Sequence, residues 1–284
     1  MFNQNIKSPI NIPVSKIHPF EGNPYKVQDN DEMNNLICSI QEQGILTPII
    51  IRPIENTDEY EVISGHRRLH ATVKAGMKEV PAFIYAVTRD EAAIMLVDSN
   101  LHREHILPSE KAFAYKLKLD AIKHQGKTSM QLAQKLSVEV VGESAGESKD
   151  NVRRYIRLTY LIPELLELVD EEKIALTPAV ELSYLTDEEQ YALLDAIELE
   201  ERTPSLSQAV RFKKLSQTGE LSCEDIEIIL QEDKANQKPM FKVSMERLQK
   251  VAPKVKDKDF EDFVIKACEH YYRYLQRQRN RDAR

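Results

Sequence analysis

The stretch Ile63-Ser64-Gly65-His66-Arg67-Arg68-Leu69-His70-Ala71 places a glycine where an apolar strand is expected to turn into a helix. A glycine at such a turn lets backbone N–H groups come close to an anion, and the N-terminal end of a helix favours negative charge. Arg67 and Arg68 add charge-assisted donors of the kind that phosphate oxygens prefer. Positive side chains at a helix N-terminus oppose the helix dipole unless an anion is present. The stretch therefore predicts a phosphate-binding turn.

The sequence around this turn alternates between strand and helix patterns. Helical apolar spacing predicts helices at 31–43, 66–75 and 89–98, and short apolar runs predict strands at 48–52, 60–63 and 80–87. A second polar cluster, Ser99-Asn100-Leu101-His102-Arg103, closes the last of these helices. The pattern describes a small mixed α/β domain over residues 1–106.

The strand signal disappears after Pro108 and returns only at 240–244. A helical domain is expected over 107–203, with Ser109 as the cap of its first helix, and a mostly helical C-terminal region over 204–284. The fold class predicted for the whole chain is therefore α+β. In the last region Phe260, Val264, Ala267, Tyr271 and Tyr274 follow heptad spacing. This heptad seam predicts either a dimer contact or the buried face of a monomeric helix. The dimer is favoured, because a two-fold symmetric protein matches a palindromic DNA site.

Composition narrows the class of protein. The chain has 284 residues, of which 42% are hydrophobic and 30% charged, with only 8 glycines, and this favours a helix-rich protein with real cores. No run approaches the ~20 apolar residues of a membrane span, and no export leader is recognisable at the N-terminus. The cysteines Cys38, Cys223 and Cys268 form no C-x-x-C pair. We expect buried free thiols and a cytoplasmic, reducing setting.

The net charge of −7 hides an uneven distribution. Residues 164–201 contain thirteen acidic residues and one basic residue, a local charge of −12, which leaves about +5 for the rest of the chain. The basic surplus includes the segment 148–157. A nucleic-acid partner is therefore compatible with the acidic total.

The segment 141–158 has the pattern of a helix-turn-helix. Small and apolar residues occur at the offsets that clamp two such helices: Val141, Gly142, Ala145, Gly146, Val152 and Tyr155. Ser148 is the expected cap of the second helix. Its exposed face carries side chains suited to base edges and phosphates: Lys149, Asn151, Arg153, Arg154 and Arg157. The other interpretation is an ordinary helical pair with a solvated basic face, and Glu147 is unusual at a position that is normally apolar.

Taken in order, these segments resemble the ParB family of partition proteins over roughly residues 10–200. The resemblance is carried by these motifs: Val14-Ser15-Lys16-Ile17-His18-Pro19 with Asn23-Pro24-Tyr25, Gly44-Ile45-Leu46-Thr47-Pro48-Ile49-Ile50-Ile51-Arg52, Gly65-His66-Arg67-Arg68, Ser99-Asn100-Leu101-His102-Arg103, and Leu107-Pro108-Ser109-Glu110-Lys111-Ala112. It implies an N-terminal domain that binds CTP with Mg²⁺ and closes as a clamp in a dimer on double-stranded DNA. The nucleotide-binding residues it implies are Thr47, Arg52, Gly65, His66, Arg67, Arg68, Asn100 and Arg103, with Asn100 also at the metal.

Two positions depart from the family pattern. The family has glutamates where this chain has His66 and Ser99. Carboxylates bind Mg²⁺ and orient an attacking water, and neither neutral histidine nor serine supplies that negative charge. We therefore expect nucleotide binding with slow CTPase activity or none.

The sequence thus predicts a dimeric, site-specific DNA-binding protein with a CTP-responsive switch domain. Its expected role is segregation of a plasmid or other mobile element beside a ParA-type ATPase, in the cytoplasm on the nucleoid or plasmid. A sequence-specific transcriptional regulator on the same scaffold is the first alternative. The second is a small-molecule enzyme, since some kinases and sulfiredoxins share the N-terminal fold; a sulfiredoxin needs a cysteine in the phosphate loop, and residues 65–68 contain none.

Overall fold

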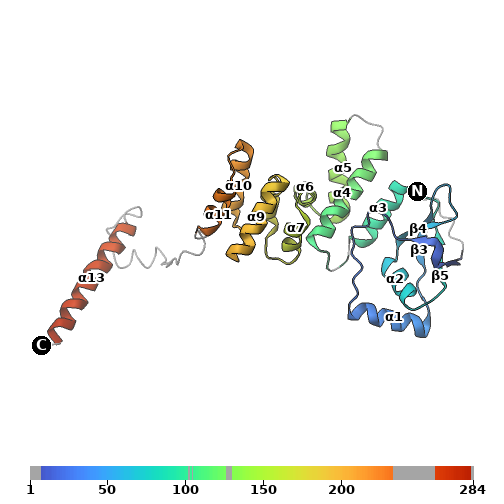
Figure 1. The fold of residues 1–284 in the computed structure, drawn as a ribbon, viewed down its shortest axis with the longest axis horizontal. Helices are drawn as coiled ribbons and strands as arrows, with labels where there is room; N and C mark the ends of the chain where they lie inside the picture. Colours follow the sequence, from blue (N-terminus) through green and yellow to red (C-terminus); the bar gives the residue numbers. More distant parts are fainter. Residues whose placement is uncertain (1–7, 102, 104, 126–129, 233–259, 283–284) are drawn as a thin grey trace. The chain divides into compact units, whose positions relative to one another are not determined.

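The computed structural model describes residues 8–101, 103, 105–125, 130–232 and 260–282. The chain divides into two compact units, residues 1–232 and 233–284. Every strand and all but one of the helices that the structure describes belong to the first unit (Figure 1).

The first unit begins with a five-stranded sheet in the order β1-β5-β3-β4-β2. Its strands are β1 (Ile10–Pro13), β2 (Ile17–His18), β3 (Ile49–Pro53), β4 (Tyr60–Ser64) and β5 (Glu79–Ile84). The central strand β3 pairs antiparallel with β4 and parallel with β5. The three expected strands are confirmed. The edge strands β1 and β2 were not expected, because each is stabilised by pairing with a strand more than forty residues away in sequence.

Helices cover both faces of this sheet. They are α2 (His66–Lys74) and α3 (Arg89–Asn100), whereas α1 (Asp31–Gln43) packs against α2, and a short 3₁₀ helix η1 (Val14–Lys16) joins β1 to β2. Alternate residues of β4 face opposite sides: Val62 packs with Leu69 of α2, whereas Ile63 packs with Leu96 of α3. The turn between β4 and α2 is therefore held by packing on both sides of the sheet.

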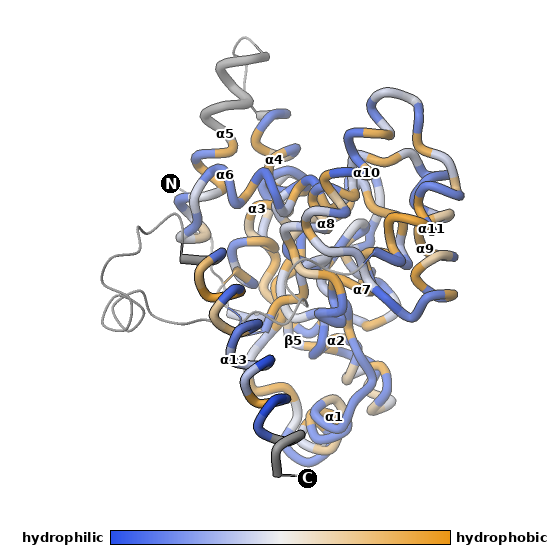
Figure 2. The backbone as a smooth tube through the Cα atoms, turned by 90° about the vertical axis from the view of Figure 1, so that its left-hand side faces the viewer, coloured by the Kyte–Doolittle hydropathy of each residue, from blue (hydrophilic) through white to orange (hydrophobic). Residues whose placement is uncertain are grey.

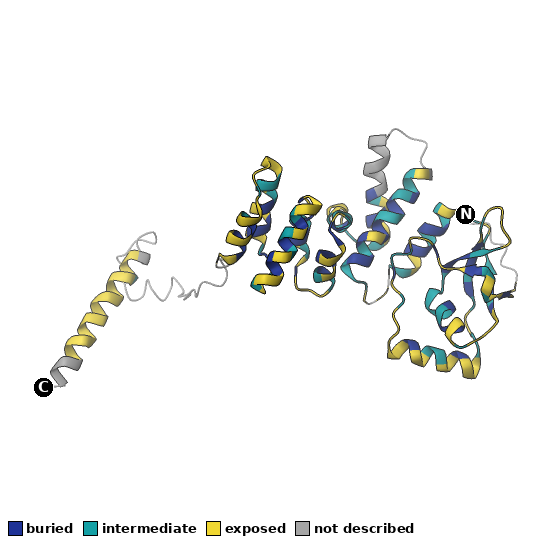
Figure 3. Ribbon diagram, in the orientation of Figure 1, coloured by how far each residue is buried: buried dark blue, intermediate teal, exposed yellow. Residues whose placement is uncertain are grey.

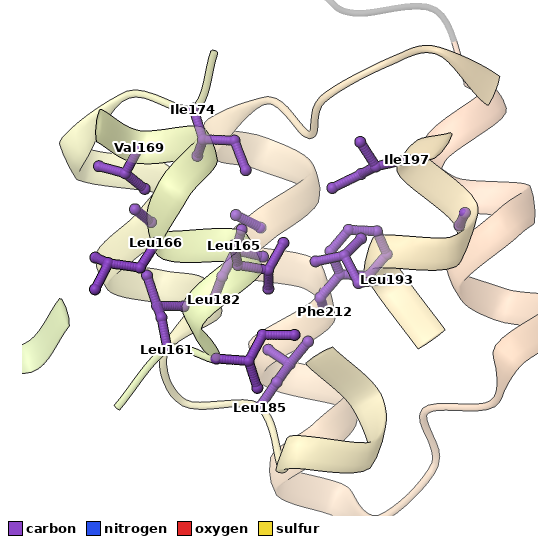
Figure 4. Close-up of a cluster of buried hydrophobic side chains, with 14 of the residues drawn as sticks. Leu161, Leu165, Leu166, Val169, Ile174, Leu182, Leu185, Leu193, Ile197 and Phe212 are labelled. Atoms are coloured by element: carbon purple, nitrogen blue, oxygen red, sulfur yellow. The ribbon is translucent and has the colours of Figure 1, made fainter. Parts of the chain in front are cut away.

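The remainder of the first unit is helical. Its helices are α4 (Pro108–Gln125), α5 (Met130–Ala145), α6 (Lys149–Leu158), α7 (Pro163–Asp170), α8 (Leu176–Leu182), α9 (Asp187–Glu200), α10 (Leu206–Thr218) and α11 (Cys223–Gln231). Figure 3 shows their buried faces turned toward one another, and Figure 4 shows the largest core cluster, which joins Leu165 of α7, Leu193 of α9 and Phe212 of α10. A mixed α/β N-terminal domain followed by helices confirms the fold class. Hydrophobic packing in this region extends past residue 203 to α11. The domain boundaries expected at residues 106 and 203 stay a prediction.

The second unit contributes α13 (Phe260–Asp282). Hydrophobic and hydrophilic segments alternate along it (Figure 2), and between 262 and 278 every side chain except Val264 is exposed. The rings of Tyr271 and Tyr274, two members of the expected seam, stack with centroids 6.3 Å apart. The strand expected at 240–244 lies outside the described residues, and dimerisation through this helix stays a prediction.

The fold also bears on the expectations about membrane spans and thiols. Among the described residues no helix is both long and apolar enough to cross a membrane. The expectation of buried thiols is wrong, because Cys38, Cys223 and Cys268 are all exposed. In α1 the core contacts are made by Met33 and Ile40, and Cys38 lies on the outer side of that helix.

Candidate functional site

The turn from β4 into α2 requires a glycine for two reasons. Gly65 has φ +103°, a left-handed conformation that side chains disfavour. A Cβ atom there would lie 2.7 Å from Cγ2 of Ile49 and 3.1 Å from a guanidinium nitrogen of Arg68. The main chain of the turn therefore packs against the start of β3 with no room for a side chain.

Helix α2 starts directly after Gly65 without a side-chain cap. Within the described part of the chain, the backbone N–H groups of His66, Arg67 and Arg68 have no acceptor. These groups give a helix N-terminus its partial positive charge. The expectation of a turn prepared for an anion is consistent with this geometry.

The two arginines of the turn differ in how they are held. Arg68 is anchored: its Nη1 donates to the carbonyl oxygens of Thr47, at 2.5 Å, and Pro48, at 2.8 Å. Among the residues that the structure describes, Arg67 pairs only with the carboxylate of Glu32, at 3.1 Å, and Glu32 is mostly exposed. Exposed pairs of this kind contribute little stability, so Arg67 is able to turn toward a ligand at small cost.

A cavity of about 330 Å³ opens beside this turn. It is lined by Asn23, Tyr25, Lys26, Val27, Ser64, Gly65, His66, Arg67, Arg68, Asn100 and Arg103. Six of the eight residues expected at the nucleotide are in this set, and they come from two motifs more than thirty residues apart. The two exceptions are Thr47 and Arg52.

Thr47 and Arg52 have structural contacts instead. The carbonyl oxygen of Thr47 accepts from Arg68, so Thr47 supports the turn from outside the cavity wall. Arg52 is buried, and its Nε donates to the carboxylate of Glu61 at 2.8 Å. The other oxygen of Glu61 accepts from the backbone of Glu21 at 2.9 Å. Contact between Arg52 and a nucleotide, which stays a prediction, requires this buried pair to open.

His66 is held as a neutral imidazole. Burial lowers the pKa of His66 to about 4, and the Glu61 carboxylate opposes that shift only in part. The Nε2 atom accepts from the backbone N–H of Phe20 at 3.4 Å. At neutral pH His66 therefore brings neither negative nor positive charge to the cavity.

Asn100 offers an acceptor at the other side of the cavity. Its Nδ2 donates to the carbonyl oxygen of Leu96 at 2.8 Å, and its Oδ1 has no donor among the described residues. The neighbouring Ser99 hydroxyl also donates to Leu96, at 3.0 Å. The end of α3 thus presents one amide oxygen to the cavity and no carboxylate.

This donor set does not fit a protein-held Mg²⁺. The ion prefers oxygen ligands and is usually held through one or two carboxylates. The cavity lining contains no aspartate or glutamate, and the described residues contain no group of three histidine, cysteine or acidic side chains placed to hold a metal. Asn100 is the single oxygen ligand expected there, so Mg²⁺ coordination stays a prediction without support from the site.

Five residues of the cavity lining were not expected at the nucleotide, and two of them, Tyr25 and Lys26, have contacts that bear on the site. Lys26 also lines an adjoining cavity of about 380 Å³, where Arg67 and Arg103 appear again. Tyr25 is buried, and its ring centroid lies 5.8 Å from the Arg103 guanidinium. The Tyr25 hydroxyl has no hydrogen-bond partner among the described residues. Both follow the Asn23-Pro24 dipeptide, but a single lysine in a loop gives no signal in one sequence.

The helix pair expected at 141–158 is present as α5 and α6, joined by a turn at 146–148. A Cβ on Gly142 would lie 2.7 Å from the carbonyl oxygen of Glu147, so the turn backbone packs directly on α5. Ser148 caps α6, accepting from the backbone of Asn151 at 3.2 Å. The unusual Glu147 has a structural explanation, because it pairs with Lys111 of α4 and accepts from the Asn151 amide at 2.8 Å.

The candidate DNA-binding side chains of α6 fall into two groups. Lys149 and Arg153 are exposed and make only weak surface pairs, with Glu139 at 3.4 Å and Asp150 at 3.1 Å. Asn151 and Arg154 are partly engaged, Arg154 donating to the Thr177 hydroxyl at 2.5 Å. The side chains of the first group are open to solvent, whereas those of the second group are held by neighbours within the protein.

Arg157 is fixed within the protein. Its guanidinium donates to the hydroxyl and the carbonyl of Ser183, at 3.0 and 2.6 Å. It also lies between the rings of Tyr160 and Tyr184, 4.4 and 3.9 Å from their centroids. These contacts join α6 to the end of α8, so they favour a positioning role over base reading.

A buried lysine joins the cavity helix α3 to the helix pair. Lys118 of α4 is 2% exposed, and its ammonium pairs with Asp98 of α3 and donates to the Ser144 hydroxyl of α5 at 2.6 Å. Asp98 precedes Asn100 by two residues. A shift of α3 is therefore felt directly by α5.

Comparison with known proteins finds similarity in the N-terminal part of the chain. Residues 3–101 match the family model described as the ParB N-terminal domain. The chain is 33% identical over 165 residues to the chromosome-partitioning protein Spo0J of Thermus thermophilus, which covers 58% of this chain and 56% of that protein. It is 32% identical over 164 residues to a nucleoid occlusion protein of Listeria monocytogenes, with 58% and 53% covered. The chain spans about half the length of these relatives.

Among solved structures, the chain is similar to a C-terminally truncated chromosome-partitioning protein ParB from Caulobacter crescentus. The form complexed to the centromeric parS site is 20% identical, with 78% of this chain and 98% of that chain covered and a TM-score of 0.42. The form complexed with CTP-gamma-S is 23% identical, with 67% and 99% covered and a TM-score of 0.32.

Proposed function

We propose that the protein is a site-specific DNA-binding partition protein with a CTP-responsive N-terminal domain, and the match of residues 3–101 to the ParB N-terminal domain model supports this proposal. One observation carries the nucleotide assignment: residues 65–68 and the pair Asn100 and Arg103 converge on a single cavity. Free N–H groups at α2 and three arginines suit phosphate oxygens. CTP is the nucleotide that the motifs imply.

We further propose that α6 contacts double-stranded DNA. Lys149 and Arg153 are exposed on it, and Ser148 fixes where the helix begins. Side chains of these types bind phosphates and base edges. Arg154 and Asn151 join them after exchanging an internal partner, and Arg157 holds the helix in place.

Contacts between the two regions support a switch. The backbone N–H of Lys26, at the cavity, donates to Glu110 at the start of α4 at 2.9 Å. The residue before Glu110, Ser109, donates from its backbone N–H to the carboxylate of Asp170 in α7 at 2.8 Å. Together with the contacts of Lys118, these bonds connect the cavity loop and α3 to the helices that pack beside α5 and α6. A shift of the loop or of α3 on nucleotide binding can therefore change the position of α5 and α6.

The biological role proposed is DNA segregation in the cytoplasm on the nucleoid, by a homodimer acting with a ParA-type ATPase. The relatives that this chain is similar to are named for chromosome partitioning and nucleoid occlusion. They favour a chromosomal target over the plasmid or mobile element expected from the sequence. Sequencing the DNA that crosslinks to the protein in cells distinguishes these targets.

The nucleotide assignment is tested by calorimetry with CTP, ATP, GTP and UTP. CTP is expected to bind most tightly, and Arg67→Ala to weaken it roughly ten- to a hundredfold, because one charged hydrogen bond of about 1.5–3 kcal/mol is removed. Arg89→Ala is the matched control, because Arg89 is exposed, pairs with Glu21 at 3.1 Å and does not line the cavity. Equal CTP affinity in Arg67→Ala and the control would contradict the assignment.

The DNA assignment is tested with a duplex selected from a random library by the full chain. Arg153→Ala is expected to weaken binding and to reduce the slope of log affinity against log salt by about 0.9 for each phosphate that the arginine neutralises. Arg211→Ala is the matched control: like Arg153, its side chain is about half exposed, and it pairs with an acidic neighbour, Glu232. An unchanged slope in Arg153→Ala and Lys149→Ala alike would show that α6 does not face DNA.

A further inference from the structure

The charges that line the cavity are all of one sign. Lys26, Arg67, Arg68 and Arg103 contribute four positive charges, and no aspartate or glutamate is present in the lining. His66, whose pKa burial lowers to about 4, is neutral at physiological pH. In nucleotide sites that contain carboxylates, a divalent cation neutralises the repulsion between those carboxylates and the phosphates. The lining of this cavity has no such repulsion to neutralise; the carboxylates of Glu110, Asp170 and Glu172 line the adjoining cavity, which shares Lys26, Arg67 and Arg103.

The four cations are also available to a ligand. Arg68 uses Nη1 for two neutral carbonyls, so its charge is not cancelled. Arg103 lies over the Tyr25 ring, and no carboxylate pairs with it among the described residues. Arg67 has the exposed Glu32 at 3.1 Å, and the Lys26 ammonium has Asp170 only at 4.0 Å. Such long or exposed pairs compete weakly with a phosphate.

We propose that this cavity binds the triphosphate of its nucleotide without a divalent cation, and that Lys26 and the three arginines supply the neutralising charge. This inference rests on the proposed function, since the phosphates are those of the nucleotide. It adds Lys26 to the binding residues. It also assigns a consequence to His66 and Ser99: without carboxylates at these positions, Mg²⁺ has only neutral oxygens in the lining, such as that of Asn100, and shares the phosphates with four cationic side chains.

A metal-free site makes a prediction of definite sign. Mg²⁺ and the arginines compete for the same phosphate oxygens, and Mg²⁺ reduces the negative charge that the cavity attracts. CTP is therefore expected to bind the full chain at least as tightly in EDTA as in saturating Mg²⁺ at matched ionic strength. A site built around the metal behaves in the opposite way.

The experiment is calorimetric titration of the full chain with CTP under both conditions. Equal or tighter binding in EDTA supports the proposal. Binding that requires Mg²⁺ overturns it and leaves the proposed nucleotide function standing. No binding under either condition overturns the proposed function, and the inference with it.

Two lysine variants locate the charge. Lys26→Ala is expected to weaken metal-free binding about tenfold or more, because one charge-assisted hydrogen bond to the phosphates is removed. Lys16→Ala is the control, because Lys16 has a side chain that is 44% exposed, pairs with Asp58 at 2.6 Å and lies outside the cavity lining. Circular dichroism of both variants checks that they are folded. Wild-type affinity in Lys26→Ala overturns the role given to Lys26.

Discussion

Gly65→Ala is expected to destabilise the N-terminal domain more than any other glycine-to-alanine change at a left-handed position. Two terms add. The positive φ of +103° costs an alanine about 1–2 kcal/mol. The new methyl would lie 2.7 Å from Ile49, and such overpacking costs about 1–3 kcal/mol. The expected loss is therefore about 2–5 kcal/mol.

Gly76→Ala is the matched control, because it separates these terms. Gly76 also has positive φ, at +74°, but a Cβ there meets nothing within 4 Å. Its alanine variant has the backbone cost alone, about 1–2 kcal/mol. The reduced freedom of alanine in the unfolded chain affects both variants alike and cancels in the comparison.

Amide hydrogen exchange of the full chain, read by mass spectrometry on peptides from residues 49–74, gives the local unfolding free energy. Gly65→Ala is expected to lose protection in β3 and α2 well beyond Gly76→Ala, and to bind CTP more weakly because the turn is displaced. If the two variants lose the same protection, Ile49 moves aside without cost. The argument that close packing fixes the turn would then be refuted.

Three further expectations concern charge. The pKa of His66 is about 4 in the folded protein against an ordinary 6.5, so between these pH values the unfolded chain binds one more proton than the folded protein. The free energy of unfolding is therefore expected to be highest above pH 6.5 and to fall by up to roughly 3 kcal/mol as the pH is lowered toward 4. Urea titrations at several pH values should show this pH dependence, and it should be smaller in His66→Gln. Asp98→Ala leaves the buried ammonium of Lys118 without its carboxylate partner and should lower the free energy of unfolding by on the order of 2–3 kcal/mol. Adding Lys118→Met should recover part of that loss. A double variant that is less stable than Asp98→Ala alone would contradict the role given to this ion pair. CTP turnover, measured as phosphate release, should be slow with or without DNA. It should rise when His66→Glu and Ser99→Glu are combined. Equal phosphate release by the native and double-variant proteins would show that another residue positions the attacking water.

Sequence reasoning succeeded where the signal is local. The helix at 31–43 was found within its observed bounds because apolar spacing and Gly44 mark it, and both describe neighbours within a few turns. The glycine turn from β4 into α2 was found for the same reason, since strand, glycine and helix are contiguous, and phosphate binding at this turn stays a prediction. Cys38 shows the limit of this reasoning: it stands next to the apolar stripe of that helix, yet the structure leaves it exposed.

The sequence by itself determined the strands β3, β4 and β5, the helices α1 to α3, the glycine turn and the helix pair, because each depends on residues that are close along the chain. Only the tertiary structure decided which charged groups are available. It buried Arg52 against Glu61, fixed Arg157 between two tyrosines, and brought Lys26 to the cavity. The physical reason is that these outcomes depend on partners from other elements. Periodicity records how a helix or strand faces its core, but the partner of a charged side chain is chosen only when distant segments pack together.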